Sequence, residues 1–157
     1  MKFLRTTLAV ALTLGAAGIA SAQTATQTVN FTVTDLNTIA VSGDVTMSVA
    51  AGGSSSTDAT TTYDVSTNSA TAKKITAYIS EVMPSGTSLS VSLANPGGGA
   101  VSAGAVALSA TTALTAQDLV TNITHLAASA KQITYVLSAD VNAAATSDAR
   151  TVTFTIQ

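Results

Sequence analysis

Side chains that commonly perform catalysis are few in this sequence. His125 is the only histidine, Glu81 is the only glutamate, and cysteine is absent. One histidine without cysteine partners does not make an ordinary zinc site, and a glycosidase needs two carboxylates flanking a sugar ring. No serine lies in a nucleophile-elbow motif, and no P-loop or dinucleotide-binding motif occurs. We therefore expect no enzyme activity and no cofactor, and we interpret His125 as a surface residue near a turn.

Aspartates recur at the predicted turns, where carboxylates and backbone carbonyls together can bind calcium. Asp44, Asp140 and Asp148 are the residues that such a calcium site would use. Their spacing is not that of an EF-hand, and Asx-turns explain aspartate at turns without any metal. We therefore expect no metal site, with calcium at these three residues as the alternative.

Period-two alternation of apolar with polar residues runs through most of the sequence and predicts short β-strands. Threonine and serine fill the polar positions, and β-branched threonine suits the solvent-facing side of a strand. The alternation places Tyr63 and Tyr135 with the core residues of their strands and Tyr78 on the outer face. The predicted strands cover residues 29–33, 39–41, 45–49, 61–65, 75–79, 89–93, 133–139 and 152–156, with a less regular apolar run at 105–108.

Glycine, proline and polar clusters separate these strands. A turn is predicted at 83–86 and a loop at 95–99, and residues 50–58 read as a flexible loop. Residues 114–123 break the alternation. Thr115 and Asp118 have a spacing like that of a capping box, which predicts one helical turn there.

The predicted fold class is all-β: an Ig-like antiparallel β-sandwich of about seven to nine strands with one short helical turn. A barrel is the alternative architecture. Tryptophan and cysteine are both absent, which excludes an antibody-type domain.

Residues 1–22 have the features of a cleaved signal peptide. Lys2 and Arg5 precede a short apolar run, and Ala20-Ser21-Ala22 supplies the small residues of a cleavage site. An uncleaved anchor helix is the alternative, although the run is short for a bilayer. We expect a single domain over 23–157, secreted or located at the cell surface or in the periplasm, with no membrane insertion after cleavage.

The expected mature chain carries little charge. Removal of Lys2 and Arg5 leaves four Lys and Arg against eight Asp and Glu, and charged residues are only 9% of the whole sequence. Nucleic acids and anionic membranes attract clusters of Lys and Arg, so we expect neither as a partner.

Two stretches of nearly identical pattern lie at opposite ends of the predicted domain: TVNFTV at 28–33 and TVTFTI at 151–156. Neither carries the charge or proline with which proteins usually protect a strand edge. Either both strands close one sandwich, or the first leaves its own fold and completes the sheet of another copy. The residues that we expect to mediate self-association are Val29, Phe31, Val33, Val152, Phe154 and Ile156.

A cysteine-free sandwich with Thr-, Ser- and Ala-rich strands and a detachable first strand resembles fimbrial and other extracellular filament subunits. The resemblance is architectural, involves no specific motif and implies a structural role. The expected function is therefore a secreted, non-catalytic structural protein whose partners are copies of itself or surface polymers. The alternative is an adhesion or polysaccharide-binding module acting through loops such as 50–58 and 95–104. A hydrolase is a third hypothesis, without any visible pair of catalytic groups.

Overall fold

The computed structural model describes residues 23–108 and 115–157. The predicted signal peptide lies outside these residues, as does Leu114, where the predicted helical turn begins. Backbone contacts divide the chain into two units, Met1–Thr32 and Val33–Gln157. In the first unit, residues 23–32 form neither strand nor helix. The second unit contains all the strands of the described chain.

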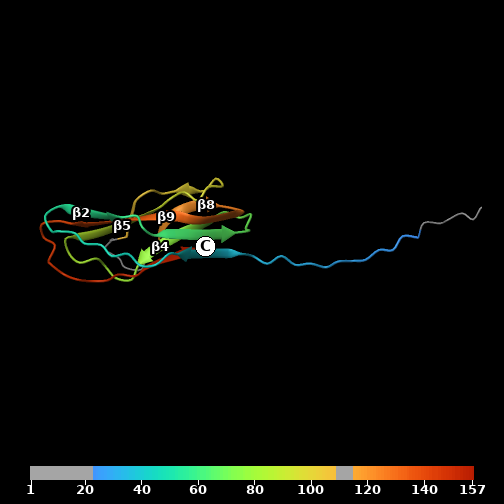
Figure 1. Ribbon diagram of the computed structural model, residues 1–157, viewed down its shortest axis with the longest axis horizontal. Coiled ribbons are helices and arrows are strands. Elements are labelled where there is room, and N and C mark those ends of the chain that lie inside the picture. Colours follow the sequence, from blue (N-terminus) through green and yellow to red (C-terminus); the bar gives the residue numbers. More distant parts are fainter. Residues whose placement is uncertain (1–22, 109–114) are drawn as a thin grey trace, which may run out of the picture. The chain divides into compact units, whose positions relative to one another are not determined.

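Val33–Gln157 folds into two antiparallel β-sheets, which confirms the predicted all-β sandwich (Figure 1). The ten strands of the described residues exceed the predicted seven to nine. No helix in the described part of the chain has the length and apolarity needed to cross a membrane. The strands are β1 (Asn37–Val41), β2 (Ser54–Asp58), β3 (Thr62–Thr67), β4 (Lys73–Ile79), β5 (Thr87–Leu93), β6 (Val101–Ser102), β7 (Val106–Ala107), β8 (Gln117–Ile123), β9 (Leu126–Ala139) and β10 (Val152–Ile156).

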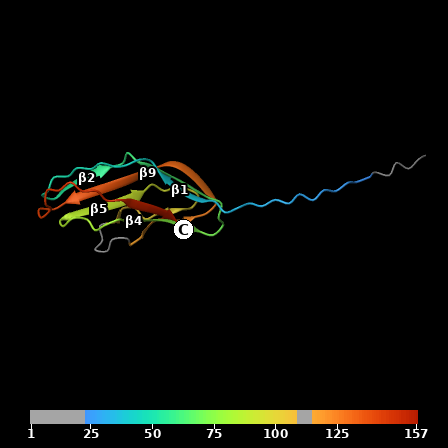
Figure 2. The same cartoon turned by 90° about the horizontal axis from the view of Figure 1, so that it is seen from below.

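One sheet has six strands and the other has four. The larger has the order β1-β3-β9-β5-β7, with β2 also paired to β9, and the smaller has the order β10-β4-β8-β6. The 14-residue β9 is long enough to pair with β3 along its first half and with β2 along its second. β1 and β10 are edge strands of opposite sheets, and they lie side by side (Figures 1 and 2).

The core lies between the two sheets and follows the alternation in the sequence. Tyr63 and Tyr135 are buried, as predicted, and Tyr78 is half-buried on the outer side of β4. Apolar side chains of moderate size fill the rest, which suits two sheets packed about 10 Å apart. The other large side chains of the core that are less than 2% exposed are Val65, Ile75, Ile79, Val91, Leu93, Leu119, Val120, Ile123 and Ile133.

The predicted helical turn over 114–123 is wrong for the described part of that segment, because Gln117–Ile123 forms strand β8. Its register against β4 shifts at two places, as happens at β-bulges. These irregularities allow the consecutive residues Leu119 and Val120 both to be buried, and Asn122 has a positive φ of 58°. A bulged strand thus produces the uneven apolar spacing that resembles a helix.

Three further predictions differ from the structure. Residues 50–58 are not one flexible loop, because Ser54–Asp58 forms β2 on β9. Residues 45–49 keep the alternation of half-buried and exposed side chains but belong to no strand. Residues 28–33 also form no strand in the single chain. Alternation of apolar and polar residues shows only which side chains can face the core. A β-strand also needs a neighbouring strand in register to accept its backbone hydrogen bonds.

Candidate self-association edge

Strand β10 pairs on one side only. Gln157 and Lys74 exchange both backbone hydrogen bonds, at 3.0 and 2.9 Å, and Ser80 N–H donates to the Thr151 carbonyl at 2.9 Å. In an antiparallel ladder such hydrogen-bonded pairs recur at every second residue. The register pairs Thr153 with Tyr78 in β4, so the odd-numbered residues of β10 direct their backbone groups toward β4.

The even-numbered residues of β10 therefore direct their N–H and C=O groups away from β4. These residues are Val152, Phe154 and Ile156, and no strand of the described chain pairs with this side of β10. Their side chains face the core but stay half-buried. The residues opposite them on β4, Ile75, Ala77 and Ile79, are at most 1% exposed. The outer edge of β10 thus has unpaired backbone groups beside incompletely covered apolar side chains.

β1 forms a second free edge beside it. Ser42 N–H donates to the Thr62 carbonyl at 2.9 Å, and Asn68 N–H donates to the Leu36 carbonyl at 3.2 Å. By the same alternation, the backbone groups of Asn37, Ile39 and Val41 point away from β3. Of the three side chains, only Ile39 packs half-buried against the core.

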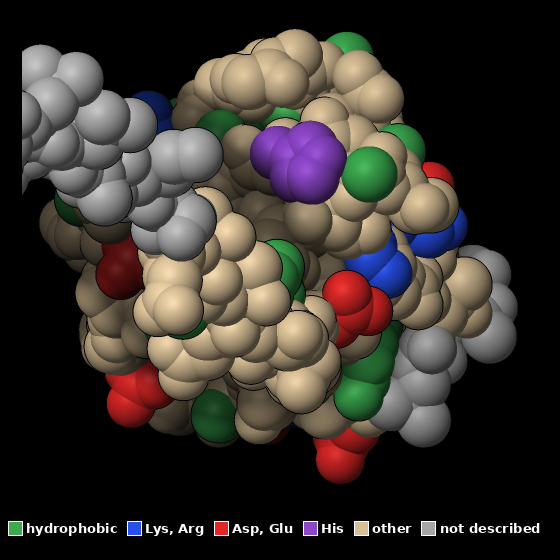
Figure 3. All heavy atoms as spheres, turned by 90° about the vertical axis from the view of Figure 1, so that its right-hand side faces the viewer, with side chains coloured by type: hydrophobic (Ala, Val, Ile, Leu, Met, Phe, Trp, Pro, Cys, Tyr) green, Lys and Arg blue, Asp and Glu red, His purple; other side chains and the backbone are tan. Residues whose placement is uncertain are grey.

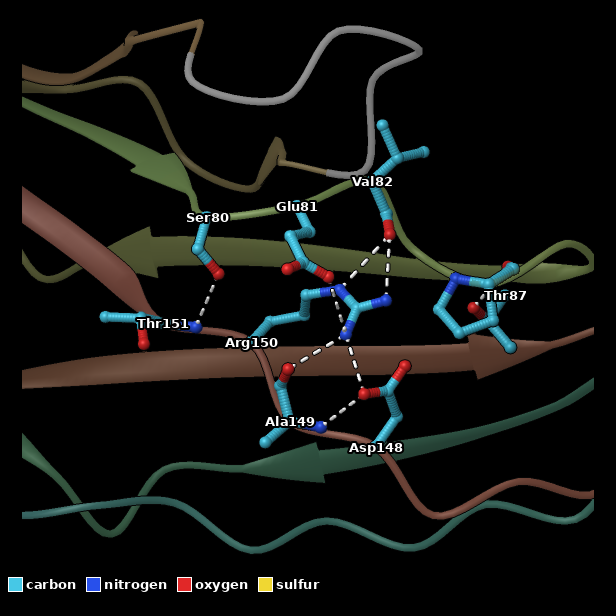
Figure 4. A network of polar contacts seen from close by, with 9 residues as sticks. Ser80, Glu81, Val82, Thr87, Asp148, Ala149, Arg150 and Thr151 are labelled. Atoms are coloured by element: carbon cyan, nitrogen blue, oxygen red, sulfur yellow. Dashed lines mark hydrogen bonds and ion pairs between the residues drawn. The ribbon is translucent and has the colours of Figure 1, made fainter.

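Arg150 fixes the start of β10. Its side chain is 13% exposed and donates from Nε and Nη2 to the Val82 carbonyl, at 3.1 and 3.0 Å. Nη1 bonds to the Ala149 carbonyl and to Asp148 Oδ1, each at 2.8 Å (Figure 4). Glu81 lies farther away, at 3.7 Å. These contacts join the segment before β10 to the segment after β4.

The segment before β1 carries three strongly exposed large apolar side chains. Val29, Phe31 and Val33 are 73%, 85% and 78% exposed. Residues 23–34 contain no charged side chain. Isolated exposed apolar residues are common, but three at alternate positions would lie on one face of a strand if this segment paired with another strand.

Asn68 holds the end of this segment. Its side-chain Oδ1 accepts the Leu36 N–H at 2.8 Å, and its Nδ2 donates to the Thr34 carbonyl at 2.8 Å. Together with the bond from Asn68 N–H to the Leu36 carbonyl, these contacts fasten residues 34–36 to the end of β3. This role was not predicted from the sequence, because Asn68 lies in an ordinary polar loop pattern.

The aspartates proposed for calcium have other partners or stand alone. Asp140 Oδ1 accepts the Asn142 N–H at 2.7 Å, as in an Asx-turn, and Asp44 is exposed. The hydrogen bond from Arg150, followed by one from Ala149 N–H, lowers the pKa of Asp148 below its usual value. Among residues 23–108 and 115–157, no three His, Asp or Glu side chains gather as metal ligands would. Calcium at these residues stays an untested alternative to the expected absence of a metal site.

His125 lies on the surface at the bend between β8 and β9, as expected (Figure 3, purple). It has a positive φ of 41° and borders an open, mainly apolar hollow that also includes Leu36 and Leu126. No Asp or Glu lines this hollow, so His125 has no carboxylate there to orient it. Its position does not suggest general-base chemistry.

Comparison with protein-family models, with curated proteins and with solved structures gives no match. This result agrees with a resemblance to filament subunits that involves no specific family motif.

Proposed function

We propose that this protein is a secreted, non-catalytic structural subunit that associates with copies of itself at the cell surface or in the periplasm. The observation that carries the proposal is an uncharged segment that exposes Val29, Phe31 and Val33, in a chain whose described strands leave one edge of β1 and one edge of β10 without a partner. Burial of three such side chains is worth about 1.5–3 kcal/mol each. A second copy of the chain is a suitable partner, because every copy that exposes such a segment also carries the free edges of β1 and β10.

The lack of charge in two segments supports this role. Neither residues 23–34 nor β10 carries a charge, so two copies can approach at these segments without electrostatic repulsion. Unprotected strand edges of this kind favour edge-to-edge pairing. Donor-strand exchange, in which the N-terminal segment completes the sheet of a neighbour, is the form of association that uses both features.

The test compares charge substitutions on the two sides of the exposed segment. The chain that starts at Gln23, with F31D and T32D variants, is studied by light scattering and negative-stain microscopy over a range of concentrations. We expect the parent and T32D to assemble, because Thr32 lies on the polar side, and F31D to stay monomeric. A parent chain that is monomeric at every concentration and pH would contradict the proposal.

A second candidate function is an adhesion or polysaccharide-binding module. An open hollow on the surface between β2, β5 and β9 is lined by hydroxyl groups and one carboxylate, including Ser55, Ser88, Ser138 and Asp140. Such groups bond readily to sugar hydroxyls. Polysaccharide binding that is lost in an S88A/S138A double variant would favour this function, and binding that is retained would exclude this site.

A further inference from the structure

We infer that residues 28–33 of one copy pair antiparallel with the outer edge of β10 in a second copy, with Val29 opposite Ile156, Phe31 opposite Phe154 and Val33 opposite Val152. The inference rests on the proposed function and adds the acceptor strand, the direction and the register. It extends the four-stranded sheet by one strand for each copy that is added.

The backbone groups of β10 match this register. Val152, Phe154 and Ile156 each present one N–H and one C=O on the side away from β4. Residues that face each other in a hydrogen-bonded antiparallel pair exchange both of their backbone bonds. Three such pairs would use every free group at this edge. Antiparallel pairing also agrees with the neighbouring pairs of the sheet, β10 with β4 and β4 with β8.

The side chains match as well. Paired residues lie on the same face of a sheet, so Val29, Phe31 and Val33 would cover the half-buried side chains of β10 on the core side. Phe31 would lie opposite Phe154, and aromatic cross-strand pairs are among the favourable ones. Asn30 and Thr32 would lie on the solvent side, opposite Thr155 and Thr153.

The neighbouring edge, β1, matches less well. In the equivalent antiparallel register its core-facing residues would be Val41, Ile39 and Asn37, opposite Val29, Phe31 and Val33. Asn37 is polar, and its Oδ1 already accepts a hydrogen bond from Thr67 Oγ1 at 2.7 Å. β10 offers three apolar partners and β1 offers two.

Pairing within one chain is prevented by the connection to β1. Asn37 pairs with Thr67 at the end of β3, and the next strand, β4, begins where Lys74 bonds to Gln157. Asn37 therefore lies at the Ile156 end of β10, whereas the proposed register places Val33 at the Val152 end. The span between these ends is about 13 Å at 3.3 Å per residue. Residues 34–36 would have to reverse direction to cover it, and Asn68 holds them.

The chain has no cysteine, so engineered disulfides can test the register directly. Asn30 and Thr155 are both exposed, and the proposed register makes them a non-hydrogen-bonded pair on the solvent side. Cα atoms in such pairs are about 4.5 Å apart, which is within the range for a disulfide. An N30C/T155C variant is oxidised in air and run on a non-reducing denaturing gel. We expect a ladder of multimers that collapses on reduction.

Two matched variants control for register and acceptor. N30C/T153C is shifted by two residues, and N30C/A40C places the second cysteine on β1. We expect ladders that are much weaker, because neither pair is directly opposite in the proposed arrangement. Single-cysteine variants give dimers at most and identify non-specific oxidation.

The outcomes separate this inference from the proposed function. If the cysteine-free chain assembles but N30C/T155C forms no ladder, or N30C/A40C forms the stronger one, β10 is not the acceptor while self-association stands. A disulfide formed within monomers would overturn pairing between copies. If the cysteine-free chain does not assemble at all, the proposed function itself fails.

Discussion

Arg150 donates two hydrogen bonds to a single acceptor, the carbonyl oxygen of Val82, from Nε at 3.1 Å and from Nη2 at 3.0 Å. The remaining nitrogen, Nη1, bonds to Ala149 and Asp148. One largely buried guanidinium thus joins the segment that leads into β10 to the segment that follows β4 (Figure 4). This contact holds the start of the strand that we propose as the acceptor edge.

Replacing Arg150 should lower stability. We expect R150A to reduce the free energy of unfolding by about 1–3 kcal/mol, because the Val82 carbonyl loses its charged donors. R150K should recover only part of this loss, because lysine lacks the planar fork. K74A is the control: Lys74 and Asp118 form an exposed pair, 42% and 46% exposed, so its loss should cost under about 1 kcal/mol. Urea unfolding measures all three, and equal losses in R150A and K74A would contradict the expectation.

Gly86 is required at the turn before β5. It has a φ of +78°, and a Cβ there would come within 2.5 Å of the Ala143 backbone nitrogen. We expect G86A to destabilise the fold by more than about 2 kcal/mol, because backbone strain and a steric clash add together. In G43A the φ is also positive, at +73°, but no described atom lies within 4 Å of the added Cβ, so the loss should be limited to about 1–2 kcal/mol. Thermal unfolding compares the two variants.

Thr61 should be replaceable with a gain in stability. Its hydroxyl is buried without a hydrogen-bond partner among the described residues. T61V removes this uncompensated polar group and keeps the shape, so we expect the free energy of unfolding to rise by about 1 kcal/mol. T67V is the control, because Thr67 Oγ1 donates to Asn37 Oδ1 and accepts the Ser69 N–H. T67V should destabilise, and a loss of stability in T61V would show that its hydroxyl has a partner.

The two buried tyrosines should make the fold sensitive to alkali. Burial raises the pKa of Tyr63 from 10.0 to about 12, and burial followed by the charge of Asp58 does the same for Tyr135. Between these values the unfolded state binds fewer protons than the folded state, so stability falls as pH rises. The two tyrosine hydroxyls should leave the free energy of unfolding unchanged below pH 10. By pH 12 each should lower it by about 2–3 kcal/mol.

Urea unfolding between pH 8 and pH 12 measures this loss. Tyr63→Phe removes one of the two titrating groups, so its stability should fall less steeply over the same interval. A parent protein and a Y63F variant with the same pH dependence would contradict a contribution from Tyr63.

Much of the fold followed from local pattern. Alternation predicted strands at 61–65, 75–79 and 89–93 and the buried positions of Tyr63 and Tyr135, because the side chains of a strand alternate between its two faces. Proline and glycine marked the turn at 83–86. The prediction was wrong at β8. Irregular pairing there buries both Leu119 and the next residue, Val120, so the apolar residues are spaced as in a helix.

The features that build the candidate site depend on contacts distant in sequence. Asn68 fastens residues 34–36, and Arg150 reaches Val82 across 68 positions. Nothing local distinguishes either residue from other polar residues in loops. Their partners become neighbours only after the sheets have formed.

The sequence by itself determined that 28–33 and 152–156 would each have one apolar and one polar face, because alternation depends only on residue order. Only the tertiary structure decided that the second stretch becomes β10 while the first stays outside both sheets. The physical reason is that a strand needs a partner with free backbone groups in register. β4 supplies that partner to 152–156, and one edge of β10 remains free among the described strands. We propose that this edge accepts residues 28–33 of another copy.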